Sequence, residues 1–175
     1  MGIAIKSDRM VVREIEISDA KSLLNYLKEP KINTLIELPK TLSGLEKYIR
    51  EKRSSRRWVI TLRETNEVIG SIVLKNISQK HQRADIGYRI GANYEWKWYM
   101  TEILSCFCEY VFSEKEIQRI QARIREDNSA SIKLAENIWF IYEGKARNFM
   151  KKNGIFYDFL LYGLTKKEKD KKSLW

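Results

Sequence analysis

The stretch RADIGYRIGANYEWKWYMTEIL, residues 83–104, determines the fold assignment. Its first eight residues place apolar side chains at every second position, which predicts a strand over residues 83–90. From Met100 the apolar residues recur with helical spacing and predict a helix that ends at Phe112. The loop between them contains Trp96 and Trp98, at positions where a turn from strand to helix is expected to have glycine. The stretch therefore predicts a strand–loop–helix unit with an unusual loop.

The flanking sequence continues this pattern. Strands are predicted at residues 9–15, 57–63, 68–77 and 119–125 and in the closing segments FIYEGKAR and FYDFLLYGL, with helices capped by Ser18, by Ser43, and by Asp127 or Asn128. Because a helix separates strand 83–90 from strand 119–125, the two strands are expected to be parallel. The order predicts an α/β (α+β) fold, with a mixed, mostly antiparallel sheet of seven strands and helices on both faces.

Composition indicates one globular domain. The chain has 175 residues, 43% of them apolar and 32% charged, and no linker divides it. No apolar run approaches the roughly 18 residues of a membrane span, and no signal peptide is recognisable, so we expect a cytoplasmic protein without membrane association. Cys106, Cys108 and the single histidine His81 do not form a zinc-binding pattern, and no metal is expected.

The net charge of +10 favours an anionic partner such as nucleic acid, the ribosome or a phosphate-rich cofactor. Five lysines of residues 166–175 form a basic tail that we expect to be solvated. No nucleic-acid-binding motif is present, so direct nucleic-acid binding is not expected. The alternative, a ribosome- or RNA-binding module that uses this tail, predicts salt-dependent RNA binding that is lost when the tail is deleted.

Four segments together resemble the GNAT acetyltransferase superfamily, most closely its RimJ/RimL-type ribosomal-protein N-terminal acetyltransferases. They are ADIGYRIG, NYEWKWYMTEIL, EDNSASIKLAENIWF and YEGKARNFMKKNGIFYDFLLYGL, and the likeness covers about residues 9–164. The resemblance implies a single acetyltransferase domain over residues 1–165, acting as a monomer or homodimer. It implies transfer of acetyl from the cosubstrate acetyl-CoA to a primary amine, most plausibly a protein N-terminus such as that of a ribosomal protein.

The resemblance also implies which residues bind acetyl-CoA. They lie at the end of the strand, in the loop, at the start of the next helix and at the start of the helix after residue 128: Tyr88, Arg89, Ile90, Glu95, Trp96, Lys97, Trp98, Tyr99, Met100, Asn128 and Ser131. The N–H groups at a helix start suit the pyrophosphate, and those of the strand end would serve the thioester carbonyl. Asn128 would hold the pantetheine arm, although a plain helix N-cap explains it equally well.

Two residues are candidates for catalysis by the same resemblance. Asp85 stands where some family members have an acidic base, but it could instead be a cross-strand charge partner of an arginine. Ser131, three residues after Asn128, matches a serine of the RimJ/RimL branch, but it could be a surface hydroxyl. Many family members have an acidic tyrosine where this chain has Ala135.

Three tryptophans occupy glycine positions of the family pattern: Trp96 and Trp98 in the loop, and Trp139 in a Gly-Phe pair that ends a helix. The indoles could simply pack, or the chain could be a degenerate, non-catalytic binding protein. The third explanation is a UGA codon that encodes glycine and was translated as tryptophan. The same replacement at three glycine positions favours the third explanation. UGA at all three codons would support an enzyme, and UGG a binding protein.

Another acceptor class is also compatible with the fold. The protein could acetylate a small amine, such as a polyamine or an aminoglycoside. The positive net charge argues against a cationic acceptor.

Overall fold

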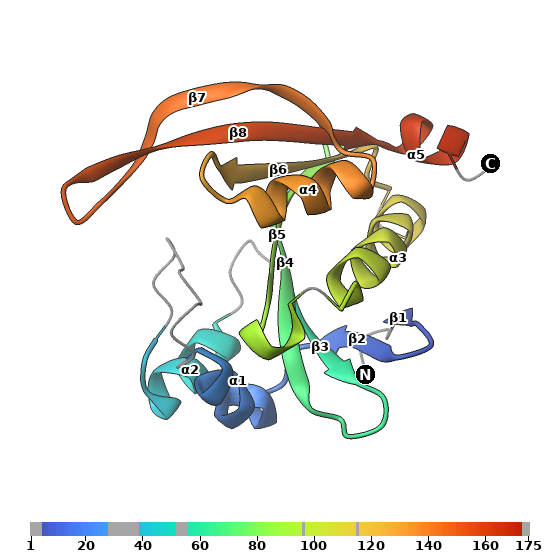
Figure 1. The fold of residues 1–175 in the computed structure, drawn as a ribbon. Coiled ribbons are helices and arrows are strands. Elements are labelled where there is room, and N and C mark those ends of the chain that lie inside the picture. Colours follow the sequence, from blue (N-terminus) through green and yellow to red (C-terminus); the bar gives the residue numbers. More distant parts are fainter. Residues whose placement is uncertain (1–4, 28–38, 52–55, 96, 115, 173–175) are drawn as a thin grey trace. The chain divides into compact units, whose positions relative to one another are not determined.

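The computed structural model describes residues 5–27, 39–51, 56–95, 97–114 and 116–172 (Figure 1). Its strands form one sheet in the order β1-β2-β3-β4-β5-β6-β8-β7. Within these residues the sheet has eight strands rather than the predicted seven, because the two-residue strand β1 (Ile5–Lys6) pairs with β2 (Met10–Glu14). The predicted fold class, a mixed sheet flanked by helices, is confirmed.

The chain divides into two compact units, and each is made of two segments. Unit 1 holds Met1–Val73 and Tyr88–Ile103, and unit 2 holds Leu74–Gly87 and Leu104–Trp175. Three elements run from one unit into the other: β4 (Val68–Ser78), β5 (Arg83–Ile90) and α3 (Tyr99–Glu114).

Unit 1 contains β1, β2, β3 (Arg56–Leu62), α1 (Ala20–Leu27) and α2 (Leu42–Arg50). Strands β2 and β3 are antiparallel, from Met10 opposite Leu62 to Glu14 opposite Trp58. The apolar faces of both helices pack on the sheet in one buried cluster: Ala20, Leu23, Leu45, Val59 and Val68. Hydrophobic burial of these apolar faces therefore stabilises both helices against the sheet.

The helix starts in unit 1 differ from the prediction. Ser18 and Ser43 are not the N-caps. A short 3₁₀ turn precedes α1, and the carboxylate of Asp19 accepts the backbone N–H of Glu16 at 2.8 Å. At α2 the hydroxyl of Thr41 accepts the N–H of Gly44 at 3.2 Å. In both cases a neighbouring side chain reaches the orphan amide, and propensity alone does not distinguish it from the serine.

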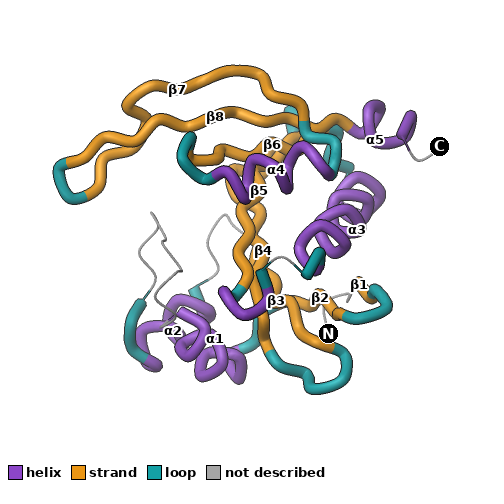
Figure 2. The backbone as a smooth tube through the Cα atoms, in the orientation of Figure 1, coloured by secondary structure: helices purple, strands orange, loops and turns teal. Residues whose placement is uncertain are grey.

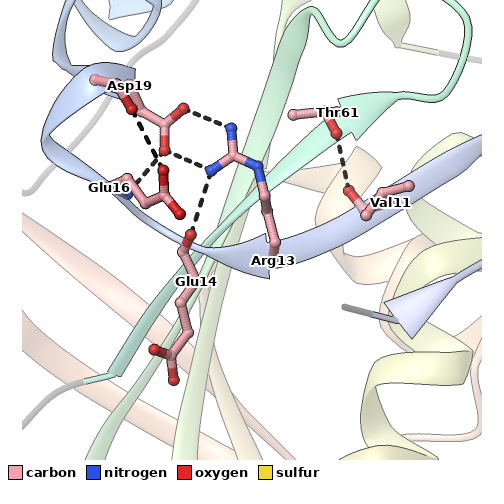
Figure 3. A network of polar contacts seen from close by, with 7 residues as sticks. Val11, Arg13, Glu14, Glu16, Asp19 and Thr61 are labelled. Carbon is pink, nitrogen blue, oxygen red and sulfur yellow. Dashed lines mark hydrogen bonds and ion pairs between the residues drawn. The ribbon is translucent and has the colours of Figure 1, made fainter. Parts of the chain in front are cut away.

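Asp19 also anchors the chain after β2 (Figure 3). Its two carboxylate oxygens accept hydrogen bonds from the Arg13 guanidinium at 2.8 and 2.7 Å. Asp19 is buried, and the bidentate pair with it raises the pKa of Arg13. The bond to the Glu16 amide uses the same carboxylate, so one buried side chain joins the strand to the start of the first helix.

Unit 2 contains β6 (Arg119–Arg125), α4 (Ser129–Asn137), β7 (Ile141–Lys152) and β8 (Ile155–Thr165). Strands β5 and β6 are parallel, from Arg83 opposite Arg119 to Ile86 opposite Ala122. This confirms the predicted crossover through α3. Both strands continue beyond that register, β5 to Ile90 and β6 to Arg125.

The β7–β8 hairpin extends past the end of β6 (Figure 1). The antiparallel register of β6 with β8 ends at Arg125 opposite Phe159, whereas β7 and β8 pair as far as Lys152 opposite Ile155. Asn153 and Gly154 turn the chain with φ values of 50° and 82°, the two positive φ angles of a type I′ turn.

The C-terminal segment was expected to be a solvated tail, but residues 166–172 form helix α5 (Lys166–Lys172), which follows β8 directly (Figure 2). Lys167 and Lys171 are exposed as expected, and the interpretation is wrong for Lys169. Lys169 is only 5% exposed, and its ammonium donates to the Ser105 hydroxyl at 2.8 Å and pairs with Glu109 at 3.0 Å. None of the helices in the described ranges is long and apolar enough to cross a membrane.

Candidate active site

The residues predicted to bind acetyl-CoA are divided between the two units. Those from Tyr88 to Met100 belong to unit 1, whereas Asn128 and Ser131 belong to unit 2, as does Asp85. Trp96 lies outside the described residues.

In unit 1 the end of β5 leads through a short turn into α3. The N–H of Gly91 donates to the Ile69 carbonyl at 2.8 Å, which fixes the end of β5 against β4. A 3₁₀ turn, Ala92–Tyr94, follows, and α3 begins at Tyr99. The carbonyl of Trp98 accepts the Glu102 N–H at 3.0 Å and so makes the first bond of the helix. The first amides of a helix have no acceptor within it, and the helix dipole is positive there, so this segment suits an anionic group.

The loop before α3 has side chains of both charges next to it. The Lys97 ammonium lies 5.5 Å from the centroid of the Tyr94 ring. Burial raises the pKa of the Glu102 carboxyl, but hydrogen bonds from Ser7 and Arg9 outweigh that effect, and the net pKa lies below its ordinary 4.5. Glu102 is therefore ionised at neutral pH, and Lys97 is the loop's own cation.

Trp98 has a backbone conformation that tryptophan rarely adopts. Its φ is 63°, in the left-handed region, and its side chain is 65% exposed. For a residue with a Cβ this conformation costs about 1–2 kcal/mol. An indole in water recovers little of that cost through apolar burial. The geometry at this position therefore favours glycine over a packed tryptophan.

Trp139 shows the same conformation at the end of α4. Its φ is 74°, the Phe140 N–H donates to the Ala135 carbonyl at 2.9 Å, and the Trp139 N–H donates to the Glu136 carbonyl at 3.1 Å. This pair of bonds is the Schellman motif, in which glycine is the preferred residue at the left-handed position. Phe140 and Ala135 are both buried, as expected for the two apolar positions of the motif. The expected positive φ at this position is confirmed.

The other residues with positive φ provide a comparison. Among the described non-glycine residues they are Asn66, Asn76, Gln82, Glu116, Asn148 and Asn153 in addition to the two tryptophans. Four of these six are asparagine, which tolerates the left-handed region because its short polar side chain bonds locally. Trp58, by contrast, lies in β3, is 2% exposed and is absent from this set, as expected for a tryptophan that packs in the core.

Asp85 lies in a buried polar network of unit 2. The carboxylate is 7% exposed, and it accepts hydrogen bonds from the Gln121 amide at 2.6 Å, the Asn76 amide at 2.8 Å and the Arg123 guanidinium at 2.8 Å. The arginine partner left open by the sequence is thus Arg123. These three donors occupy both carboxylate oxygens of Asp85. The geometry favours an anchoring role for Asp85 over that of a free base.

Asn128 and Ser131 lie in the first turn of α4. The Asn128 side-chain oxygen accepts the Ser131 N–H at 3.1 Å, so Asn128 is the N-cap of this helix. Ser131 is partly exposed. The cap explains Asn128 structurally.

Sequence reasoning missed three residues that support these groups: Gln121, Arg123 and Arg9. Strand alternation contains a signal for two of them, because Gln121 and Arg123 share one face of β6 in a strand parallel to that of Asp85. Arg9, which contacts the loop before α3, has no such signal because it is distant in the sequence. Among the described residues, no group of three or more His, Cys, Asp or Glu side chains could hold a metal ion.

The model of the Acetyltransferase (GNAT) domain family matches residues 9–140. The chain belongs to this family. GNAT proteins are acetyltransferases, so the chain is assigned as an enzyme of that class. The uncharacterized N-acetyltransferase YoaA of Bacillus subtilis (strain 168) is 31% identical over 93% of this chain and 96% of its own. The [ribosomal protein uS5]-alanine N-acetyltransferase of Escherichia coli (strain K12) is 24% identical over 93% of this chain and 91% of its own.

Solved GNAT structures share the fold. RimL, a ribosomal-protein α-N-acetyltransferase in complex with coenzyme A, gives a TM-score of 0.85 at 19% identity, covering 93% of this chain and 98% of its own. A mutant of spermidine N-acetyltransferase SpeG from Vibrio cholerae gives 0.82 at 20% identity, covering 95% and 99%. At such identities the likeness establishes the GNAT fold, and the relatives include enzymes for both protein and polyamine acceptors.

Proposed function

We propose that this GNAT protein transfers acetyl from acetyl-CoA to the N-terminal amine of a protein, with a ribosomal protein as the expected acceptor. The relatives that act on ribosomal proteins support the reaction class. A cytoplasmic location suits such an acceptor and is part of the proposal. The same proposal assigns acetyl-CoA binding to the end of β5 and the loop before α3 in unit 1, and a role for the start of α4 in unit 2 rests on the family resemblance alone.

The observation that carries the choice of acceptor is the charge on the projecting end of the β7–β8 hairpin. Residues 147–157 include Arg147, Lys151 and Lys152 and no acidic residue. Phe149, Ile155 and Phe156 are exposed there. A polyamine, which is a polycation, would be repelled by this surface, whereas a polypeptide can contact apolar and basic side chains together.

In the proposed reaction the acceptor nitrogen attacks the thioester carbon, the N–C bond forms and the C–S bond breaks. The amine must lose a proton, and the departing thiolate must gain one. Backbone N–H groups of Tyr88 to Ile90 are proposed to hold the thioester carbonyl. We assign the Ser131 hydroxyl as proton donor to the thiolate. Asp85 is proposed as the acidic group next to the acceptor amine, with the buried network described above as its alternative role.

A panel of acceptors tests the proposal. The protein is incubated with acetyl-CoA and with peptides that have a free N-terminus, the same peptides with a blocked N-terminus, and spermidine, and the products are identified by mass spectrometry. Acetylation of free-N-terminal peptides alone supports the proposal. Acetylation of spermidine in preference to every peptide refutes the acceptor assignment.

Charge reversal on the hairpin sharpens the test. Lys151→Glu/Lys152→Glu should raise KM for an N-terminal peptide and leave KM for acetyl-CoA unchanged. Lys80→Glu, at an exposed lysine in the turn before β5, is the control and should change neither value. An equal response of both variants would mean that the hairpin charge has no specific role.

A further inference from the structure

One side chain outside the predicted site, Arg9, contacts both the loop before α3 and the first turn of that helix. Arg9 Nε and Nη2 donate to Glu102 Oε2 at 3.1 and 2.5 Å. Its Nη1 donates to the Lys97 carbonyl at 3.4 Å, and its guanidinium carbon lies 4.4 Å from the centroid of the Tyr99 ring. The contacts thus join the loop backbone, the first residue of α3 and a side chain of the first helical turn.

The backbone around Arg9 is fixed by hydrogen bonds from Arg63. The Arg63 N–H donates to the Arg9 carbonyl at 3.0 Å. The Arg63 guanidinium donates to the carbonyls of Ser7 at 3.3 Å and Asp8 at 3.2 Å. Arg63, which directly follows β3, is therefore hydrogen-bonded to the turn between β1 and β2. These bonds fix the backbone from which the Arg9 side chain extends.

We propose that Arg9 is a positioning residue for acetyl-CoA: it holds the backbone of Lys97 and the first turn of α3 in the conformation that receives the pyrophosphate. The inference rests on the cofactor part of the proposed function. Arg9 acts through geometry, because its charge is matched by the Glu102 carboxylate and its planar group is stacked on Tyr99. A loop fixed before binding loses less conformational freedom when the ligand arrives, so affinity rises without a direct contact.

Three substitutions separate positioning from direct charge attraction. Arg9→Met removes the charge and all polar contacts. Arg9→Lys keeps the charge but loses the two-pronged geometry and the planar stacking. Glu102→Gln removes a negative charge near the proposed phosphate site, which by charge alone would tighten binding of the anion. If Arg9 and Glu102 position the loop, all three variants weaken binding, and Glu102→Gln does so against the electrostatic expectation.

Calorimetric titration of acetyl-CoA tests this in the 175-residue chain and in its Trp96→Gly/Trp98→Gly variant. We expect each of the three substitutions to raise Kd about tenfold, a change of about 1.4 kcal/mol. The KM for acetyl-CoA should rise in parallel, and kcat at saturating acetyl-CoA should stay within about twofold. Arg119→Met breaks a comparably exposed ion pair, with Glu143 in unit 2, and should leave Kd unchanged.

The titrations distinguish a failure of the positioning role from a failure of the proposed acetyl-CoA binding. Wild-type affinity in Arg9→Lys, or tighter binding in Glu102→Gln, would overturn the positioning role in favour of simple charge. Unchanged Kd in Arg9→Met with a parent that binds would overturn the inference alone. A lack of acetyl-CoA binding in both parent chains would overturn the cofactor part of the proposed function together with the inference.

Discussion

Replacing Trp139 by glycine and by alanine tests whether the left-handed conformation at the end of α4 requires glycine. Both changes remove the indole, which is 43% exposed, so the loss of its contacts cancels when the two variants are compared. They differ only in backbone preference at a φ of 74°. Alanine pays about 1–2 kcal/mol for the left-handed region, whereas glycine loses roughly 0.5–1 kcal/mol more conformational freedom on folding. Trp139→Gly should therefore be more stable than Trp139→Ala by about 0.5–1 kcal/mol.

Trp58 is the control because it has an ordinary strand conformation. It is 2% exposed in β3, and both of its substitutions should destabilise strongly, by about 3–5 kcal/mol. There the order of the two variants reverses, since glycine has no conformational advantage in a strand and should be about 0.5–1 kcal/mol below alanine. The stability of the glycine variant relative to the alanine variant is thus expected to have opposite signs at residues 139 and 58. This comparison does not depend on the size of the cavity left by the indole.

Urea and thermal unfolding of the four variants measure these differences. For a chain of this size 1 kcal/mol corresponds to a Tm shift of about 2–4 °C. If Trp139→Gly is no more stable than Trp139→Ala, the position does not demand glycine, and the argument for glycine at the equivalent conformation of Trp98 is refuted with it.

Four further predictions concern the site and the core. Trp96→Gly/Trp98→Gly should tighten acetyl-CoA binding about a hundredfold or more, because two phosphate hydrogen bonds at roughly 1.5–3 kcal/mol each become available; equal affinities by calorimetry would contradict this. Ser131→Ala should lower turnover about 10²-fold or more at unchanged stability, and a loss below about threefold would remove it from catalysis. Asp85→Asn should lower the free energy of unfolding by about 1–3 kcal/mol along with turnover, since it disturbs three hydrogen bonds to a buried carboxylate; turnover preserved per folded molecule would indicate an anchor. Burial raises the pKa of the Cys108 thiol from its ordinary 9.0 to about 12. The thiol should therefore not react with maleimide in the native protein at pH 8. The contribution of Cys108 to the free energy of unfolding, complete below about pH 9, should be lost between pH 9 and 12.

The strands were predictable because alternation is a local property. The predicted bounds of strands 83–90 and 119–125 agree with the structure, and their parallel pairing follows from the intervening helix. The two-residue β1 was missed because so short a strand has no period of its own. Helix α5 was missed because a lysine-rich composition indicates solvation, whereas Lys169 is held by partners on α3 that are distant in sequence.

The candidate site was predictable only in part. The resemblance selected the loop and the start of α4, and the positive φ expected at Trp139 is observed. The sequence could not show that Asp85 is buried, because its partners come from β4 and β6 and Asn76 reaches it from a left-handed conformation. Arg9 was missed for the same reason. The catalytic roles and the single-domain boundary stay predictions.

The interleaving of the two units has a consequence for how the chain folds during synthesis. Residues 1–73 leave the ribosome first, but unit 1 also needs residues 88–103, so it cannot close until more than half of the chain has been made. Unit 2 in turn includes residues up to the C-terminus. Neither unit corresponds to a single continuous gene segment: a chain of residues 1–103 contains all of unit 1 together with residues 74–87 of unit 2. A nascent chain stalled before residue 88 should therefore be protease-sensitive throughout, and one stalled with residue 103 outside the exit tunnel should be the first to protect its N-terminal segment.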